Sequence, residues 1–286
     1  MPLARTADLL TPGATIAAFN VITVEHAEAI ATGAEAAGSP AVLQISENAV
    51  KFHGGNLTPL ATATAAVARS SSAPLALHLD HVESIDLLHA ASAHDFSSVM
   101  YDASKLPYAE NVKATADAAR WAHTRGLWLE AELGRVGGKP GDAHTPGVRT
   151  DPAEAAAFVA DTGVDALAVA VGSSHAMTAR TATLDHTLIA ALRDAVPVPL
   201  VLHGSSGVPD PELRRAVTAG IRKVNVGTAL NTAFTGAVRA FLEAHPSTVD
   251  PRRYLAPARE AMAATVERFL DALAGPHPAA EVGRPD

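Results

Sequence analysis

The 286-residue sequence contains no cysteine. The chain therefore has no disulfide framework, no thiolate metal ligand and no cysteine nucleophile. Any transition metal must be held by imidazole and carboxylate groups, which 13 histidines and 30 acidic residues can supply.

Basic clusters and long apolar runs are absent as well. The net charge of −8 argues against non-specific nucleic-acid binding, which needs a basic surface. No apolar stretch approaches the roughly 18 residues of a membrane span, and Met1–Leu10 lacks the apolar run of a secretory signal. We therefore expect a cytoplasmic protein with no nucleic-acid or membrane partner.

Short apolar runs alternate with alanine-rich helical segments along the chain, and 48% of the residues are hydrophobic. Eight strands, each followed by a helix, predict a (β/α)8 barrel that forms a single domain over residues 1–286. A doubly wound sheet is the alternative, but it normally has fewer strands. The predicted strands are Thr15–Phe19, Ala41–Ile45, Leu75–Leu79, Ser98–Met100, Leu127–Ala131, Ala166–Ala170, Leu200–Leu202 and Lys223–Val226.

Two regions fall outside this alternation. Helices at Thr232–Ala244 and Pro257–Ala274 are predicted to form a C-terminal extension over 232–274, and residues 275–286 are predicted to be a disordered tail. The segment Gly134–Thr150 is rich in glycine and proline and follows the fifth strand. A loop of this length in a compact domain is usually a functional lid or disordered.

Three of the predicted strands are followed by a histidine: His81, His175 and His203. In a barrel of this kind the loops after the strands meet at one rim, so the three imidazoles are expected to converge. Three imidazoles with an open fourth position are typical of a catalytic zinc site. The alternative is that each is a separate core or capping histidine.

Asp80 directly precedes His81, and Asp102 and Glu132 also end predicted strands. Neighbouring side chains of a strand point to opposite faces, so Asp80 need not bind the same ion as His81. It can act as a general acid/base or orient a histidine, and the spacing does not choose between these roles. Glu130 and Glu132 share a face, where they could be charge partners or form an outer shell around the metal; we expect instead that one or both bond rim histidines.

Two small, donor-rich loops follow strands seven and eight: His203–Gly207 and Asn225–Thr228. Barrels commonly bind phosphate with the backbone N–H groups and helix N-termini at this place. A phosphate site is therefore predicted here, with ordinary glycine turns as the alternative.

Five motifs in order resemble the class II, zinc-dependent ketose-bisphosphate aldolases, and in particular the branch of tagatose-bisphosphate and short fructose-bisphosphate aldolases. They begin at His78, Ser98, Glu130, His203 and Lys223 and read HLDH, SVMYDAS, EAELGRVGG, HGSSG and KVNVGT. The likeness extends from Ala18-Phe19-Asn20 to Pro257-Ala258-Arg259.

The resemblance implies an enzyme of carbohydrate metabolism, such as glycolysis, that reversibly cleaves a ketose bisphosphate to dihydroxyacetone phosphate and glyceraldehyde 3-phosphate. It implies one Zn²⁺ held by His81, His175 and His203, a monovalent cation (Na⁺ or K⁺), and a homodimer or homotetramer. Asp80 matches the acid/base, and Asp102 and Glu132 match carboxylates beside the metal or at an alternate metal position. The matched substrate-binding positions are Asn20, Gln44, Ser46, Ala176, Gly204, Ser205, Ser206, Asn225, Val226, Gly227 and Thr228.

A Schiff-base mechanism would need a lysine at the rim. The sixth strand region, Ala166–Gly172, has none, and Lys223 begins its predicted strand and is expected at the opposite rim. Lys105 and Lys139 are on the right side but in loops, so we do not favour this route.

The sequence departs from the family pattern at two places. Ala176 stands where relatives have glycine, and the lid reads Gly137-Gly138-Lys139-Pro140-Gly141-Asp142, with Asp142 as its nearby acid in place of the usual acidic pair. Asp142 is therefore the candidate for the second proton transfer. The departures leave two alternatives: an aldolase for a different phosphorylated or unphosphorylated ketose, and a non-catalytic protein that retains zinc.

Overall fold

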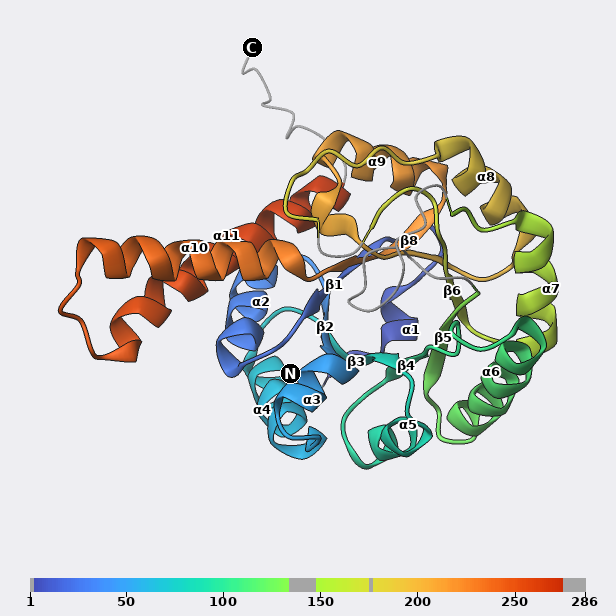
Figure 1. Cartoon of the computed structure of the whole chain (residues 1–286), viewed down its shortest axis with the longest axis horizontal. Helices are drawn as coiled ribbons and strands as arrows, with labels where there is room; N and C mark the ends of the chain where they lie inside the picture. Colours follow the sequence, from blue (N-terminus) through green and yellow to red (C-terminus); the bar gives the residue numbers. More distant parts are fainter. Residues whose placement is uncertain (1–2, 134–147, 175–176, 275–286) are drawn as a thin grey trace, which may run out of the picture.

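Eight parallel strands close into a barrel in the computed structural model, which describes residues 3–133, 148–174 and 177–274 (Figure 1). Each strand pairs with the next along the chain, and β8 pairs with β1. The predicted (β/α)8 barrel is confirmed. The strands are β1 (Ile16–Asn20), β2 (Ala41–Ser46), β3 (Leu75–Val82), β4 (Ser98–Tyr101), β5 (Trp128–Glu132), β6 (Ala166–Ala168), β7 (Leu200–Leu202) and β8 (Ile221–Val226).

Helices surround the barrel on the outside (Figure 1). The surrounding helices are α2 (Val24–Ala36), α4 (Leu57–Ser70), α5 (Ile85–Ala90), α6 (Tyr108–His123), α7 (Pro152–Thr162), α8 (His186–Ala195) and α9 (Asp210–Ala219), with the short α3 (Glu47–Phe52) after β2. Asp151 caps α7 as its position before a proline predicts, since its carboxylate accepts the backbone N–H groups of Ala153 and Glu154. Asp210 also precedes a proline, but it is the first residue of α9 and forms ion pairs with Arg180 and Arg268.

The core has two layers because strand residues alternate between the barrel interior and the helices. On β1, Phe19 belongs to the large hydrophobic cluster between the strands and the helices. Its ring packs edge to face against Phe269 of the C-terminal helix α11 (Pro251–Ala274). Ile16 and Ala18 belong to a small cluster with Val42 and Ala76 inside the barrel. Leu9 and Leu10, at the end of α1 (Thr6–Leu9), pack against this inner cluster, so the barrel is filled with side chains rather than open.

The C-terminal helices differ from the predicted ones. The helix expected from Thr232 is α10 (Thr228–Ala244), and the helix expected from Pro257 is α11 (Pro251–Ala274). Pro257 therefore lies inside α11, where a proline removes one backbone N–H. Packing of α11 against α10 and α2 outweighs this local preference, and the α10–α11 pair extends outward from the barrel (Figure 1). The predicted tail, 275–286, lies outside the described residues.

None of the helices in the described parts of the chain combines the length and apolar character that a membrane crossing needs.

Candidate active site

A pocket of about 360 Å³ lies where the barrel strands end. Most of the residues predicted for the site line it: Asn20, Gln44, Ser46, Asp80, His81, His203, Gly204, Ser206, Asn225, Gly227 and Thr228. They come from five strands and the segments that follow them, so the structure brings together residues far apart in the sequence.

The other predicted residues lie behind the pocket or outside the described residues. Ser205 is buried and its hydroxyl donates to the carbonyl of Leu202, while Val226 is part of the hydrophobic core. Asp102 and Glu132 are buried and close to His81. The positions that lie outside the described residues are Asp142, His175 and Ala176.

The backbone of β3 changes course at His81, which has φ +48°, the sole positive φ among described residues other than glycine. The pairing of β3 with β4 shifts register between Leu79 and Val82 at the same place. A side chain with a Cβ adopts this conformation at a cost of about 1–3 kcal/mol, and such strain is concentrated at functional sites. It breaks the strict alternation of the strand, so Asp80 and His81 both reach the pocket.

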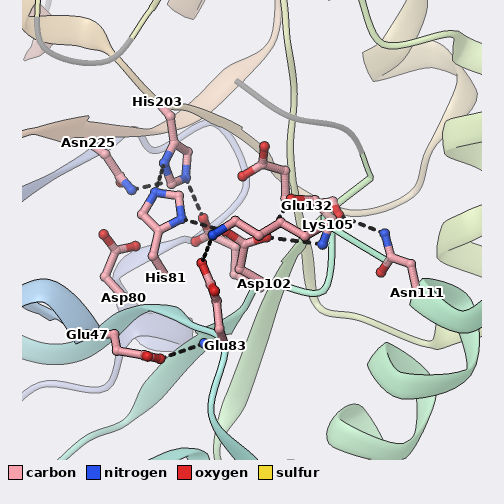
Figure 2. Close-up of polar contacts among 12 residues, drawn as sticks. Glu47, Asp80, His81, Glu83, Asp102, Lys105, Asn111, Glu132, His203 and Asn225 are labelled. Carbon is pink, nitrogen blue, oxygen red and sulfur yellow. Dashed lines mark hydrogen bonds and ion pairs between the residues drawn. The ribbon is translucent and has the colours of Figure 1, made fainter. Parts of the chain in front are cut away.

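Two carboxylates orient the imidazoles of His81 and His203, and Figure 2 labels one of them, Asp102, beside His81. His81 Nδ1 lies 3.1 Å from Asp102 Oδ2, and His203 Nε2 lies 2.9 Å from Glu130 Oε1. A carboxylate accepts the ring N–H, which leaves the other ring nitrogen with a lone pair. The remaining nitrogens, His81 Nε2 and His203 Nδ1, face one another 3.0 Å apart.

When both rings donate to their carboxylates, two lone pairs face each other at this distance, and a cation between them removes their repulsion. Two nitrogen ligands of a tetrahedral zinc, each about 2.0–2.1 Å from the ion, are separated by roughly 3.3 Å. The observed 3.0 Å is close to this value. An oxygen of Asp80 also lies within 4.8 Å of one ring nitrogen of each histidine. The donor set, made of imidazole and carboxylate, therefore fits a divalent transition metal.

Asp80 is buried and held from both sides. Its Oδ2 accepts a hydrogen bond of 3.3 Å from the amide of Gln44, which also donates to Asn20 Oδ1 at 2.5 Å, and its Oδ1 lies 3.7 Å from His78 Nε2. Burial alone would raise the pKa of Asp80, but the imidazoles of His81, His78 and His203 hold it well below its usual value. Asp80 is therefore an ionised carboxylate at neutral pH, facing the pocket.

Lys223 is not at the opposite rim as predicted. It is the third residue of β8, and its side chain is fully buried inside the barrel, where its amino group lies 2.7 Å from Glu130 Oε2. Burial opposes the charge of Glu130, but Lys223 and the hydrogen bond with His203 lower its pKa to about 2. Glu130 thus bonds a rim histidine, as expected for one of the two glutamates.

The two loops predicted to bind phosphate meet at one side of the pocket. Gly204 has φ +70°, and a Cβ on it would lie 2.5 Å from the carbonyl oxygen of Ser174. The hydroxyl of Ser206 accepts the backbone N–H of Ala229, which ties the β7 loop to the first turn of α10. Gly227 and Thr228 place the N-terminus of α10 at the pocket, where backbone N–H groups favour an anion.

Sequence reasoning missed further residues that line the pocket: Glu47, Asn48, Lys51, Glu83, Ser174 and Asn231. Glu47 accepts the backbone N–H of Glu83 and pairs with Lys51 at 2.8 Å (Figure 2 shows the first contact). The i,i+4 spacing of Glu47 and Lys51 was the one sequence feature that could have indicated this ion pair. The helix α3 is too short to show a clear helical period in the sequence.

A family model described as fructose-bisphosphate aldolase class-II matches residues 8–275. The chain belongs to this family. The family implies a divalent metal and a phosphorylated sugar substrate, in agreement with the paired imidazoles and the two small loops.

Individual aldolases agree with this assignment. The chain is 40% identical over 250 residues to a fructose-bisphosphate aldolase from Geobacillus stearothermophilus, and the match covers 87% of each chain. The crystal structure of the YdjI aldolase from Escherichia coli K12 is 31% identical, with a TM-score of 0.80 over 95% of this chain and 97% of that one. A crystal structure from Coccidioides immitis, 29% identical, has a TM-score of 0.83 over 96% and 97% of the two chains.

Proposed function

We propose that this class II aldolase uses zinc to cleave fructose- or tagatose-1,6-bisphosphate reversibly to dihydroxyacetone phosphate and glyceraldehyde 3-phosphate. The observation that carries the proposal is the pair of ring nitrogens of His81 and His203, facing one another 3.0 Å apart in the pocket that Asp80 lines. We propose His175, by resemblance, as the third ligand. Zinc suits an imidazole site in a chain without thiolates.

The chemistry divides between the metal and the residues of this chain. A bound divalent ion supplies Lewis-acid polarisation of the substrate carbonyl, which stabilises the enediolate character that cleavage leaves. Asp80 takes the proton of the C4 hydroxyl in cleavage and returns it in condensation. Gln44 and Asn20 fix the direction of its carboxylate through the hydrogen bonds described above.

The phosphate of the dihydroxyacetone half is assigned to the loops after β7 and β8. The N–H groups of Gly204–Ser206 and of Gly227–Thr228 are the proposed donors, since backbone N–H groups and a helix N-terminus bind phosphate well. For Ser205 and Val226 the proposed contribution is the backbone alone, because both side chains point into the protein. Asp142 is kept as the proposed acid for the carbon-bound proton, and a monovalent cation beside the phosphate and a homodimer or homotetramer are kept as proposals from the resemblance.

The test is cleavage of a panel of phosphorylated ketoses by the purified protein, followed with a coupled assay for both products. We expect cleavage of a 1,6-bisphosphate that a chelator abolishes and added zinc restores. Borohydride treatment with substrate is expected to leave no adduct. Covalent trapping on a lysine, or full activity in the chelated protein, would reject the proposal.

Proton exchange on dihydroxyacetone phosphate distinguishes an enzyme from a protein that only binds. The exchange needs no aldehyde partner, so it reports the metal and the phosphate loops without depending on the second product. We expect zinc-dependent exchange. Zinc and dihydroxyacetone phosphate binding without exchange would indicate the non-catalytic alternative.

A further inference from the structure

Lys223 has an unusual position for a lysine. Its side chain has no exposed surface and lies inside the barrel, where layers of apolar side chains are the rule. Its amino group lies 2.7 Å from Glu130 Oε2, and the second oxygen of the same carboxylate lies 2.9 Å from His203 Nε2. The side chains of the three residues are at most 1% exposed.

A buried ion pair is by itself weak evidence for a role in stability. Replacing a buried ion pair by apolar residues of similar volume is often neutral or stabilising, because the desolvation penalty can exceed the attraction between the charges. The ion pair fixes the orientation of the Glu130 carboxylate. Lys223 binds one carboxylate oxygen, and the other oxygen is thereby held beside Nε2 of His203.

Among the described residues, Glu130 and Asn225 compete for His203 Nε2. Glu130 Oε1 lies 2.9 Å from it, and the amide nitrogen of Asn225 lies 3.1 Å from it. A carboxylate requires a proton on Nε2, whereas an amide N–H requires a lone pair there, so the two partners favour opposite tautomers. The hydrogen bond to the charged carboxylate is the stronger one.

The tautomer of His203 decides what its other nitrogen can do. With the proton on Nε2, Nδ1 presents a lone pair toward His81 Nε2, 3.0 Å away. With the proton on Nδ1, the same position is blocked for a metal. We propose that Lys223 is a positioning residue that, through Glu130, selects the Nε2–H tautomer of His203 and so prepares Nδ1 to bind the metal. This inference rests on the proposed function in one respect, that His203 is a metal ligand.

The unaltered, metal-free protein gives the first test. Long-range proton–nitrogen NMR spectra distinguish protonated from bare imidazole nitrogens, and the His203 ring is assigned as the signal set lost in a His203→Asn variant. We expect His203 to carry its proton on Nε2. A proton on Nδ1 would overturn the inference, and no substitution at Lys223 is needed to see it.

Two variants then test the lysine together with its carboxylate partner. Lys223→Met leaves Glu130 buried without its cation, which can prevent folding. The double variant Lys223→Met/Glu130→Leu removes both charges and the competing acceptor, and the amide of Asn225 remains beside Nε2. We expect the double variant to fold, to carry the proton on Nδ1 and to bind zinc about 10–100-fold more weakly, the usual effect of losing a partner of a metal-bound histidine.

The matched control is Lys113→Met, which removes an exposed lysine from α6 and should leave zinc affinity unchanged. Zinc affinity is measured by competition with a chromophoric chelator, and the visible spectrum of the Co²⁺ form reports the ligand geometry. Folded Lys223 variants with the zinc affinity, Co²⁺ spectrum and His203 tautomer of the unaltered protein would refute the inference. Failure of the unaltered protein to bind zinc would instead refute the proposed function.

Discussion

Asp80 and His81 are adjacent on β3, yet an oxygen of Asp80 and a ring nitrogen of His81 lie within 4.8 Å of each other and of a His203 ring nitrogen. A regular strand would place the two side chains on opposite faces. The left-handed backbone of His81, with φ +48°, removes this separation. The strain at one residue thus brings the proposed acid/base, Asp80, and a proposed metal ligand, His81, to the same side of the strand.

The strain predicts an unusual order of stability for substitutions at His81. His81→Gly and His81→Ala both remove the imidazole, but glycine adopts positive φ without a steric penalty, whereas alanine costs about 1–2 kcal/mol there. We expect the metal-free glycine variant to be the more stable by about 1 kcal/mol in urea unfolding.

The same pair of substitutions at exposed Lys113 in α6 serves as a control. There alanine should be the more stable by about 1 kcal/mol, because the helix disfavours glycine. An alanine variant at His81 as stable as the glycine variant would show that the backbone at this position is not strained in solution.

Replacing Asp80 tests its role in proton transfer. Asp80→Asn keeps the shape of the side chain and the contact with Gln44 but cannot accept the substrate proton. General acid/base catalysis contributes about 10²–10⁴-fold, so kcat should fall by this factor. Zinc content, measured by atomic absorption, should remain that of the unaltered protein. Normal turnover in a zinc-loaded Asp80→Asn protein would remove the assigned role.

Gly204 and Gly54 form a matched pair for the phosphate loop. Both have φ +70°, but a Cβ at Gly204 would lie 2.5 Å from the Ser174 carbonyl, while nothing lies within 4 Å of one at Gly54. Gly54→Ala should lose about 1 kcal/mol of stability and keep its kinetics. Gly204→Ala displaces the loop as well, so KM for the phosphorylated substrate should rise by at least 10-fold. Equal KM values for the two variants would argue against a phosphate site at this loop.

The buried titratable groups predict loss of stability in acid for the metal-free protein. Burial lowers the pKa of His78 and His203 below 6.5, and Glu130 is lowered from 4.5 to about 2. A group whose pKa is lower in the folded state binds protons more readily when unfolded, so its contribution is present above the unfolded pKa and is lost as the pH falls. Stability should decline first below about pH 6.5, through the histidines, and again below about pH 4.5, with Glu130 contributing on the order of 3 kcal/mol.

Urea unfolding at a series of pH values checks this prediction. The free energy of unfolding should decrease in both steps. A value that stays constant between pH 7 and pH 4 would show that the histidines are not buried in their neutral form.

The barrel and most of the pocket could be predicted because each apolar strand ends in polar residues, and the carboxyl ends of parallel strands meet at one rim. The sequence does not show the backbone turn at His81, since alternation describes only regular strands. It also placed Lys223 wrongly, because a position along a strand does not reveal how far a four-carbon side chain reaches inside a barrel. The start of α11 at Pro251 depends on packing against α10 and α2, which local proline rules do not include.

The most direct test of the metal-dependent mechanism is the location of the ion. Crystals of the zinc-loaded protein, measured on both sides of the zinc absorption edge, would identify it. We predict one strong anomalous peak about 2.0–2.1 Å from both His81 Nε2 and His203 Nδ1, beside the carboxylate of Asp80. A peak beside His81 Nδ1 or His203 Nε2, or at a site away from these two histidines, would contradict the metal-dependent mechanism.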